Sequence, residues 1–315
     1  MSIFKQIGTN IEGYTLDQAT NIAGLSWTVD KRPIWTLDKD GKATTTSKFF
    51  ATTRNDTNEV LGIVGPDYQV IQNSDLAWLC QRVSSTDAVV ETAGYLRSGA
   101  RVWYQMRGNP FGVGTKKDEN IPYCLFSNGH DGQHPISALP TSIRVICENT
   151  LNMAHSNAAR DGMIISLRHT GDMTGRLEAM AKSIELFKES TERFKVQANV
   201  LASKEVTTQF VQDFWTKVYM RCVDTIPYNA TSDREKEQQA KAESVVMKWS
   251  NTFDSEVKHS GANLWTALNA ITSWIDHDQI YRGNNKAQNK FNDTIYGKRA
   301  KEKVGIFNYA LQFAS

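Results

Sequence analysis

The sequence has few cysteines, almost no net charge and no long apolar segment. With no CxxC pair among its cysteines, neither a disulfide framework nor a cysteine-based zinc site is expected, and we predict reduced thiols in a cytoplasmic protein. The cysteines are Cys80, Cys124, Cys147 and Cys222. Lys and Arg total 36 against 34 Asp and Glu, which gives a formal charge of +2. This balance argues against a dominant basic face, so contact with nucleic acid would need local clusters of positive charge.

Several functional signatures are also missing. The N-terminus has no apolar run of signal-peptide length, and no segment reaches eighteen uninterrupted apolar residues, so we expect no membrane partner. There is no nucleophile elbow, Walker motif or paired-carboxylate signature. Gly112 and Gly114 are too few, and too poorly placed before a helix, to form a phosphate loop. We therefore expect no cofactor, and no catalytic residues are assigned.

The length and composition of the chain are those of a globular protein. Its 315 residues, 40% hydrophobic and 10% aromatic, suffice for one large domain or two ordinary ones. The pattern predicts an α+β protein: an antiparallel sheet domain with short helices over residues 1–170, then a helical region over residues 171–315 that ends in a basic tail.

The first half is expected to be mostly strands. Thr15 and Gln18 form a capping box for a short helix that ends near Ile22. Asp40-Gly41 is a strong hairpin signal, and together with a turn at residues 55–58 it predicts a three-stranded meander. The strands of this meander are 34–37, 43–53 and 60–64. A short helix over 76–83, capped by residues 73–75, and a hairpin of strands 89–96 and 101–107 should follow. Residues 110–120 are expected to be a polar, mobile loop, and a strand over 163–169 should end the domain.

The second half is expected to be helical. Apolar residues spaced by three and four from Leu177 to Leu201 form a heptad seam. Its partner is either an internal helix near residues 206–218, which we favour, or another subunit. A capping box at Ser232 and Glu235 opens a charged helix predicted to end near Trp249. A last amphipathic helix covers residues 261–278, and its aromatic side chains are expected to be core.

Polar residues gather between residues 126 and 170 among apolar ones. They are either a satisfied network or a site, because burying them without partners costs several kcal/mol. His130, Asp131 and His134, with His169, offer nitrogen and oxygen ligands to a metal. The alternative is that Asn128 and Asp131 shape a turn and His130 bonds to the backbone. We assign no metal ligands.

The same region has residue types suited to nucleic acid. Arginines, amides and nearby aromatic residues can contact phosphates and stack on bases, although strand alternation must place some of these aromatics in the core. Lys116 and Lys117 are either phosphate contacts or solvated loop charges. The basic tail contains seven Lys or Arg and two acidic residues between residues 282 and 303. This composition fits equally a segment that binds single-stranded nucleic acid and a solvated surface loop. The predicted nucleic-acid-binding residues are Arg97, Arg101, Trp103, Arg107, Lys116, Lys117, Asn128, Arg144, Asn149, Arg168, His169, Arg282, Lys286, Lys290, Lys298 and Arg299.

An ordered series of short motifs resembles the phage/plasmid-like family of uncharacterised proteins, a domain of unknown function carried by phages, conjugative plasmids and prophage islands. The motifs lie at residues 65–73, 91–94, 99–103, 127–132, 144–151, 168–170, 265–270 and 274–277. The resemblance covers about residues 60 to 280. It implies a mobile-element setting and no specific activity.

These observations lead to a ranked set of hypotheses. The first is a single-stranded nucleic-acid-binding protein of a mobile genetic element that binds single-stranded DNA, forms a homo-oligomer and supports strand annealing in recombination. In outline, the expected fold is similar to the single-strand-annealing recombinases of phages, an analogy of fold alone. The second is a protein-interaction module that blocks a host defence system. The third is a metal-dependent hydrolase centred on His130.

Overall fold

The computed structural model describes residues 3–84, 88–144, 150–152, 166–184, 187–227 and 229–314, and it is α+β as predicted. The chain divides into two compact units, neither of which is one continuous segment. Unit 1 comprises Met1–Asn109, Tyr123–Thr141 and Ala154–Ser190, and unit 2 comprises Pro110–Pro122, Ser142–Met153 and Thr191–Ser315. The sequence interpretation expected two continuous domains with one boundary near residue 170, and that boundary stays a prediction. None of the described helices combines the length and apolar content needed to cross a bilayer.

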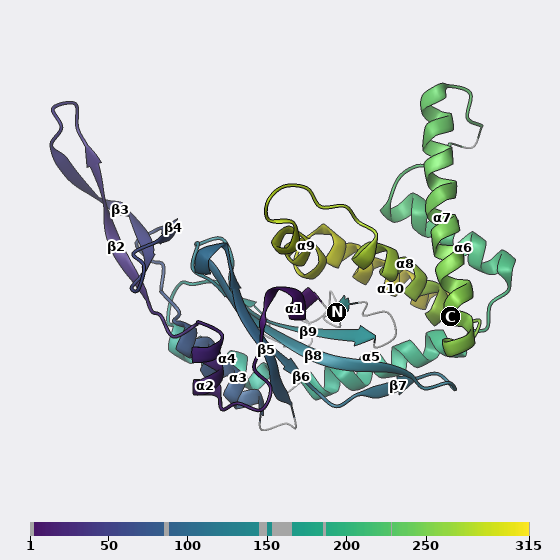
Figure 1. Ribbon diagram of the computed structural model, residues 1–315, viewed down its shortest axis with the longest axis horizontal. Helices are drawn as coiled ribbons and strands as arrows, with labels where there is room; N and C mark the ends of the chain where they lie inside the picture. The colour runs from purple at the N-terminus through teal and green to yellow at the C-terminus, as the bar shows by residue number, and fades with distance from the viewer. Residues whose placement is uncertain are drawn as a thin grey trace. The chain divides into compact units, whose positions relative to one another are not determined.

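Unit 1 contains the predicted three-stranded meander, ordered β2-β3-β4. Its strands are β2 (Val29–Leu37), β3 (Ala43–Arg54) and β4 (Val60–Val64). β2 and β3 continue past β4 as a two-stranded ribbon that projects from the rest of the unit (Figure 1). At its tip Asp38 Oδ1 accepts hydrogen bonds from the backbone N–H of Asp40 and Lys42, each at 2.9 Å, and Gly41 has a φ of +78°. We call residues 29–33 and 50–54 the inner ribbon and residues 34–49 the outer ribbon.

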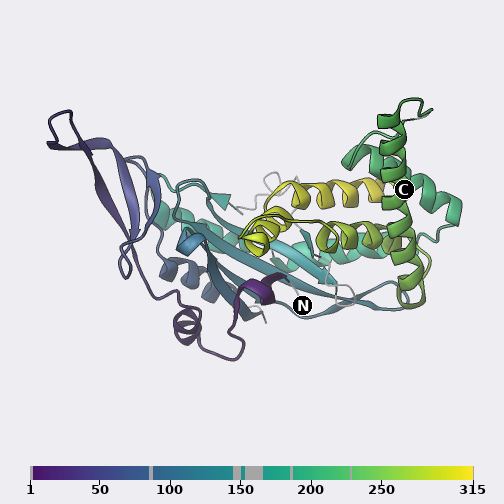
Figure 2. The ribbon, with the colours of Figure 1, turned by 45° about the horizontal axis from the view of Figure 1, so that its top comes forward.

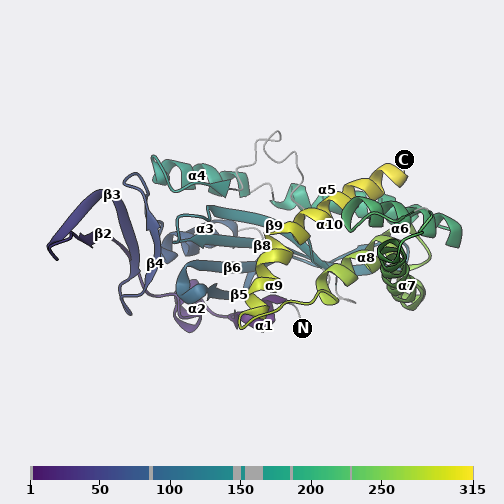
Figure 3. The ribbon, with the colours of Figure 1, turned by 90° about the horizontal axis from the view of Figure 1, so that it is seen from above.

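The larger sheet of unit 1 is antiparallel, in the order β1-β5-β6-β8-β9, with β11 paired to β9 (Figure 3). Its strands are β1 (Thr9–Asn10), β5 (Val89–Leu96), β6 (Arg101–Arg107), β8 (Asp118–Gly129), β9 (Ile136–Arg144) and β11 (Ser166–Leu167). The helices of unit 1 are α1 (Ile3–Ile7), α2 (Leu16–Ile22), the one-turn η1 (Arg97–Gly99), α3 (Asn73–Ser84) and α4 (Met173–Ile184). The predicted capping box at Thr15 and Gln18 is confirmed at the start of α2. Helix α3 packs on β5 and β6.

Both faces of β6 are covered, which places its aromatic residues in the core. The Trp103 ring meets Phe4 of α1 edge-on at 5.7 Å, whereas the Tyr104 hydroxyl lies 2.8 Å from that of Thr20 in α2. The predicted alternation of these side chains is therefore confirmed. Trp103 and Tyr104 are both fully buried, so neither offers a face for stacking on a base.

Unit 2 is mainly helical. Its elements include β7 (Phe111–Val113), β10 (Thr150–Asn152), most of α5 (Phe187–Ser203), α6 (Thr208–Cys222), α7 (Asp233–Ser260), α8 (Leu264–His277), α9 (Lys286–Ile295) and α10 (Lys298–Ala314). Helices α8 and α10 lie side by side (Figure 2). The capping box at Ser232 and Glu235 is confirmed. The end expected near Trp249 is wrong, because nothing stops the helix before Gly261, whose φ of +86° ends it.

The core of unit 2 is aromatic. The Phe194 ring stacks on Phe307 of α10 at 5.4 Å and meets Trp265 of α8 at 6.1 Å. The indole N–H of Trp265 donates to Asp118 Oδ2 at 2.8 Å. Asp118 begins β8, which pairs with β7. Residues 110–120 are therefore not the expected irregular loop, because this pairing and the buried Asp118 hold them in a hairpin.

Candidate functional site

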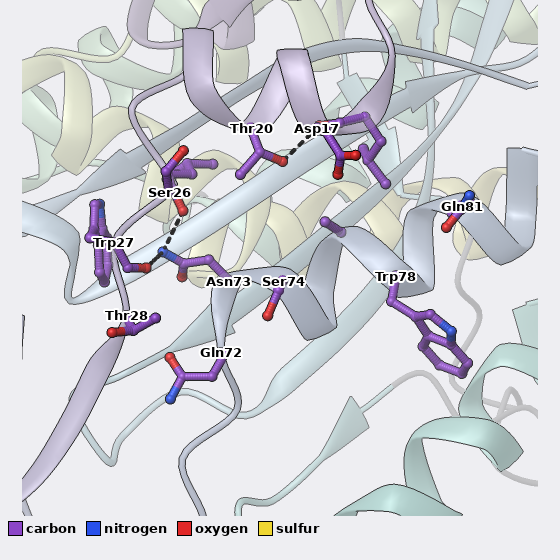
Figure 4. Close-up of a pocket in the computed structure, with 13 residues that line it drawn as sticks. Asp17, Thr20, Ser26, Trp27, Thr28, Gln72, Asn73, Ser74, Trp78 and Gln81 are labelled. Carbon is purple, nitrogen blue, oxygen red and sulfur yellow. Dashed lines mark hydrogen bonds between the residues drawn. The ribbon is translucent and has the colours of Figure 1, made fainter.

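Residues 65–73, one of the motifs singled out in the sequence, fix the chain where β2 begins. Gln72 accepts from Val29 N–H and donates to the Val29 carbonyl, both at 2.9 Å, as a paired strand residue would. Asn73 Nδ2 donates to the carbonyls of Leu25 at 3.0 Å and Trp27 at 3.1 Å. These amides line a cavity of about 390 Å³ (Figure 4). Since the fold already uses their hydrogen-bonding groups, we interpret this cavity as structural.

His130 belongs to the same buried network. Its Nε2 lies 3.0 Å from Asn73 Oδ1, and because an amide oxygen only accepts, the ring carries its proton on Nε2. Burial lowers the pKa of His130 to about 3, assisted by His169, so the ring is neutral. The His130 carbonyl accepts from Thr52 Oγ1 at 2.6 Å, which ties β3 to the end of β8. Asn128 is fully buried and donates to the Ile71 carbonyl at 2.9 Å. Both side chains are scaffold.

The inner ribbon is locked by further contacts. Arg54 binds Asp56 with two nitrogens, at 2.9 and 2.7 Å, and donates to the Ser98 carbonyl at 2.9 Å. Its guanidinium lies 4.3 Å from the Trp27 ring centroid. A Cβ on Gly62 of β4 would come within 2.5 Å of the loop that follows β8, so only glycine fits. The ribbon therefore has a rigid base.

The outer ribbon, by contrast, is exposed. Trp35 is 62% exposed, Leu37 73% and Phe49 52%. Trp35 lies opposite Thr45 and Leu37 opposite Ala43, so the side chains of Trp35 and Leu37 share one face of the strand pair. Three exposed lysines lie in the same stretch, and none forms an ion pair with any residue the structure describes: Lys39, Lys42 and Lys48. Apolar and positively charged side chains are thus presented together on the outer ribbon, with Asp38 and Asp40 at its tip.

A second polar feature of unit 1 is a cavity of about 570 Å³, which we call the His134 cavity. It is lined by Tyr68, Gly132, Gln133, His134, Pro135, Ser166, Arg168, His169 and Thr170. Arg168 is exposed at this cavity. Its buried neighbour His169 stacks on Tyr68 at 4.7 Å and hydrogen-bonds through Nδ1 to the Gln69 carbonyl at 3.0 Å. Burial lowers the pKa of His169.

Asp131 organises the turn at this cavity, as the turn-forming alternative expects. The rest of that alternative is wrong, because Asn128 lies in β8 and bonds to Ile71, and the His130 ring bonds to the side chain of Asn73 and not to backbone. Its Oδ1 accepts from the backbone N–H of Gln133 at 2.9 Å and of His134 at 3.1 Å, and its Oδ2 lies 2.9 Å from His134 Nδ1. Burial opposes ionisation of Asp131, but the hydrogen bonds from the His134 ring and the two backbone amides outweigh it and lower the pKa to about 2. In the part of the chain that the structure describes, no three His, Cys, Asp or Glu side chains cluster as a metal site requires.

The predicted nucleic-acid-binding residues fall into separate groups. Four are buried: Arg101, Trp103, Asn128 and His169. Two others, Arg107 and Lys116, are engaged within the fold. Arg107 pairs with Glu12 and Glu91, while Lys116 Nζ donates to two carbonyls at the end of α7, at 3.1 and 2.8 Å. The remaining exposed or half-buried residues are Arg97, Lys117, Arg168, Arg282, Lys286, Lys290, Lys298 and Arg299. Asn149 and the side chain of Arg144 lie outside the described residues.

The basic tail is only partly available for binding. Arg299 donates to Glu302 at 2.7 Å and to Gln279 at 2.9 Å, and Lys298 pairs with Glu302 at 3.5 Å. Lys303 is fully buried, 2.7 Å from Asp276. The positive side chains that remain, exposed or half-buried and without an ion pair to a described residue, are Arg282, Lys286, Lys290 and Lys301. We refer to these four positive side chains of unit 2 together as the cationic patch, and Phe291 between them in sequence is core.

The sequence interpretation did not single out the outer ribbon as a candidate binding surface. The sequence feature that could have indicated it is the Asp40-Gly41 turn flanked by Trp35 and Phe49. The aromatic residues of a hairpin stay exposed when no helix packs on them.

The family model of DUF932, a domain of unknown function, matches residues 60–296, which is three quarters of the chain. The protein therefore belongs to the DUF932 family. No curated protein and no solved structure matches the chain. Residues 65–73, His130 and the His134 cavity lie inside the matched segment, whereas the two strands of the ribbon precede it.

Proposed function

We propose that this protein binds single-stranded nucleic acid along the outer ribbon and supports strand annealing for a mobile genetic element. The observation that carries the proposal is the exposure of Trp35 and Phe49 beside three lysines on a rigidly based arm. Exposed aromatic rings stack on unpaired bases whatever their sequence, and lysines neutralise the phosphates between them.

Burial elsewhere in the molecule favours this surface over the region predicted from sequence. Each aromatic residue expected to line a groove near residues 103–126 is at most 4% exposed, so that groove lacks a stacking platform: Trp103, Tyr104, Tyr123 and Phe126. The cationic patch of unit 2 has positive charge but no exposed aromatic ring. It is suited to phosphate contacts, which do not depend on the sequence of the nucleic acid.

A single strand is a better ligand for the ribbon than a duplex. In a duplex the base faces are stacked on one another, so Trp35 and Phe49 would have no partner. A protein with a formal charge of +2 also lacks the broad basic surface that binding by backbone charge alone requires. Stacking is therefore expected to dominate, with a modest dependence on salt.

The test is fluorescence anisotropy of a labelled, unstructured oligonucleotide across several salt concentrations. The double variant Trp35→Ala and Phe49→Ala should lose most binding, and Lys42→Ala with Lys48→Ala should reduce the slope of log Kd against log salt. Tyr14→Ala, which removes another exposed aromatic residue of unit 1, is the matched control and should bind normally. Wild-type binding by the Trp35/Phe49 variant, or no binding by the wild type at about 50 mM salt, would refute the proposal.

A further inference from the structure

The His134 cavity has the size and lining of a small-molecule site. Its volume of about 570 Å³ lies within the usual range for ligand pockets, roughly 300–1,000 Å³. At the 390 Å³ cavity, the amides of Gln72 and Asn73 are hydrogen-bonded within the fold. At the His134 cavity, by contrast, several polar side chains are not required for the fold.

Arg168 is the first of these. Its side chain is exposed at the cavity and forms no ion pair or hydrogen bond with a described residue. Its backbone is nevertheless held in place, because Arg176 Nη1 donates to the Arg168 carbonyl at 3.0 Å and also to the Thr170 carbonyl. The guanidinium is thus a fork of donors on a fixed backbone, the geometry suited to a carboxylate or a phosphate.

His134 is the second. Its side chain is 32% exposed, and its Nδ1 is held by Asp131 Oδ2 at 2.9 Å. The carboxylate on Nδ1 fixes the orientation of the imidazole where it lines the cavity. The carboxylate of Asp131 already accepts three hydrogen bonds within the turn.

The other ionisable side chains that line the cavity, His169 and Tyr68, carry no negative charge. Burial keeps His169 neutral by lowering its pKa, and burial of Tyr68 raises the pKa of its phenol, which donates to the Gly129 carbonyl at 2.9 Å. Arg176, bound to the backbone carbonyls, adds positive charge. Among the residues that line the cavity, Arg168 is the one with a permanent charge, and that charge is positive.

We propose that the His134 cavity binds the phosphate group of a nucleotide-sized ligand through Arg168 and His134. The hydroxyls of Ser166 and Thr170 and the amide of Gln133 supply further donors around it. A phosphate has three or four acceptor oxygens in a tetrahedral arrangement, which suits donors that come from several directions better than a planar carboxylate does. This site is separate from the outer ribbon and does not depend on its proposed function.

Isothermal titration calorimetry with inorganic phosphate and with a nucleoside monophosphate tests the site. Arg168→Ala should weaken binding of both at least about tenfold, His134→Ala should weaken it less, and Arg168→Lys should restore part of it. Arg97→Ala removes an exposed arginine elsewhere in unit 1 and should leave the affinity unchanged. Thermal unfolding of each variant confirms that it is folded.

The outcomes separate this site from the ribbon. Phosphate binding that persists in the Trp35/Phe49 variant supports the site whether or not the strand-binding proposal holds. Competition by an oligonucleotide bearing a terminal phosphate would identify a strand end as the ligand, whereas a mononucleotide alone competing would identify a free nucleotide. The proposal is overturned if neither phosphate nor mononucleotide binds, or if Arg168→Ala binds both as the wild type does.

Discussion

Asn73→Ala should destabilise unit 1 strongly, although the change removes only a small polar side chain. Asn73 is 2% exposed and connects three segments: Nδ2 donates to the carbonyls of Leu25 and Trp27, and Oδ1 accepts from His130. Alanine at this position leaves two carbonyls and one ring N–H in the interior without partners.

The magnitude follows from that count. A typical internal hydrogen bond contributes about 0.5–1.5 kcal/mol net, and each buried group left unsatisfied costs about 1–3 kcal/mol. For three partners we expect a loss of about 3–5 kcal/mol, reduced if water enters the adjoining 390 Å³ cavity. A loss of this size is a large share of the stability of an ordinary domain.

Urea unfolding followed by tryptophan fluorescence measures the effect, because Trp27 lies at the bonds that are lost. Asn73→Asp keeps the shape but places a carboxylate oxygen against two carbonyl oxygens, so it should be at least as damaging. Ser74→Ala changes the exposed neighbouring residue and should be nearly neutral. A loss below about 1 kcal/mol for Asn73→Ala would contradict the view that this network holds the base of the ribbon.

Three further predictions concern stability. Burial, with a smaller repulsion from a neighbouring histidine, lowers the folded-state pKa of His130 from 6.5 to about 3, so the unfolded state takes up this proton first. The free energy of unfolding is therefore unaffected by this proton above about pH 6.5 and falls as the pH drops toward 3. His130→Gln should flatten this part of the stability–pH profile, whereas His259→Gln, at an exposed position, should not. Gly62→Ala should cost about 1–3 kcal/mol in urea unfolding because its Cβ meets backbone at 2.5 Å, whereas Gly65→Ala, with nothing within 4 Å, should be neutral. Lys303→Ala should cost about 3–5 kcal/mol in the same assay because it removes the ammonium that faces the buried Asp276 carboxylate at 2.7 Å, and a loss below about 1 kcal/mol would refute that.

Local signals in the sequence predicted the fold class and several helix starts. The capping boxes at Thr15 and Ser232 involve residues three positions apart, so the sequence displays both partners. The three-stranded meander was likewise predicted from local signals, the turn residues between its strands. The hairpin at residues 110–120 could not be predicted, since Asp118 bonds to Trp265, 147 residues away, and Gly114 N–H bonds to Asn199.

The polar cluster shows the same limit. Asn128 and His130 each find their partner 57 residues earlier, and His169 bonds to Gln69, 100 residues earlier. A single sequence gives the residue types of such a network but not its pairings, so the same residues were equally compatible with a ligand site. The outer ribbon was not predicted as a candidate surface for a different reason: the exposure of its aromatic residues is decided by tertiary structure, which a strand pattern does not show.

The central claim is that the outer ribbon binds single strands by stacking, and the affinity of Trp35→Ala for an unstructured oligonucleotide tests it most directly. Because the side chain is 62% exposed, the variant should unfold at the same urea concentration as the wild type. Loss of one stacked base costs about 1–3 kcal/mol, which raises Kd roughly 5-fold to 150-fold. An unchanged Kd with an unchanged fold would contradict the claim.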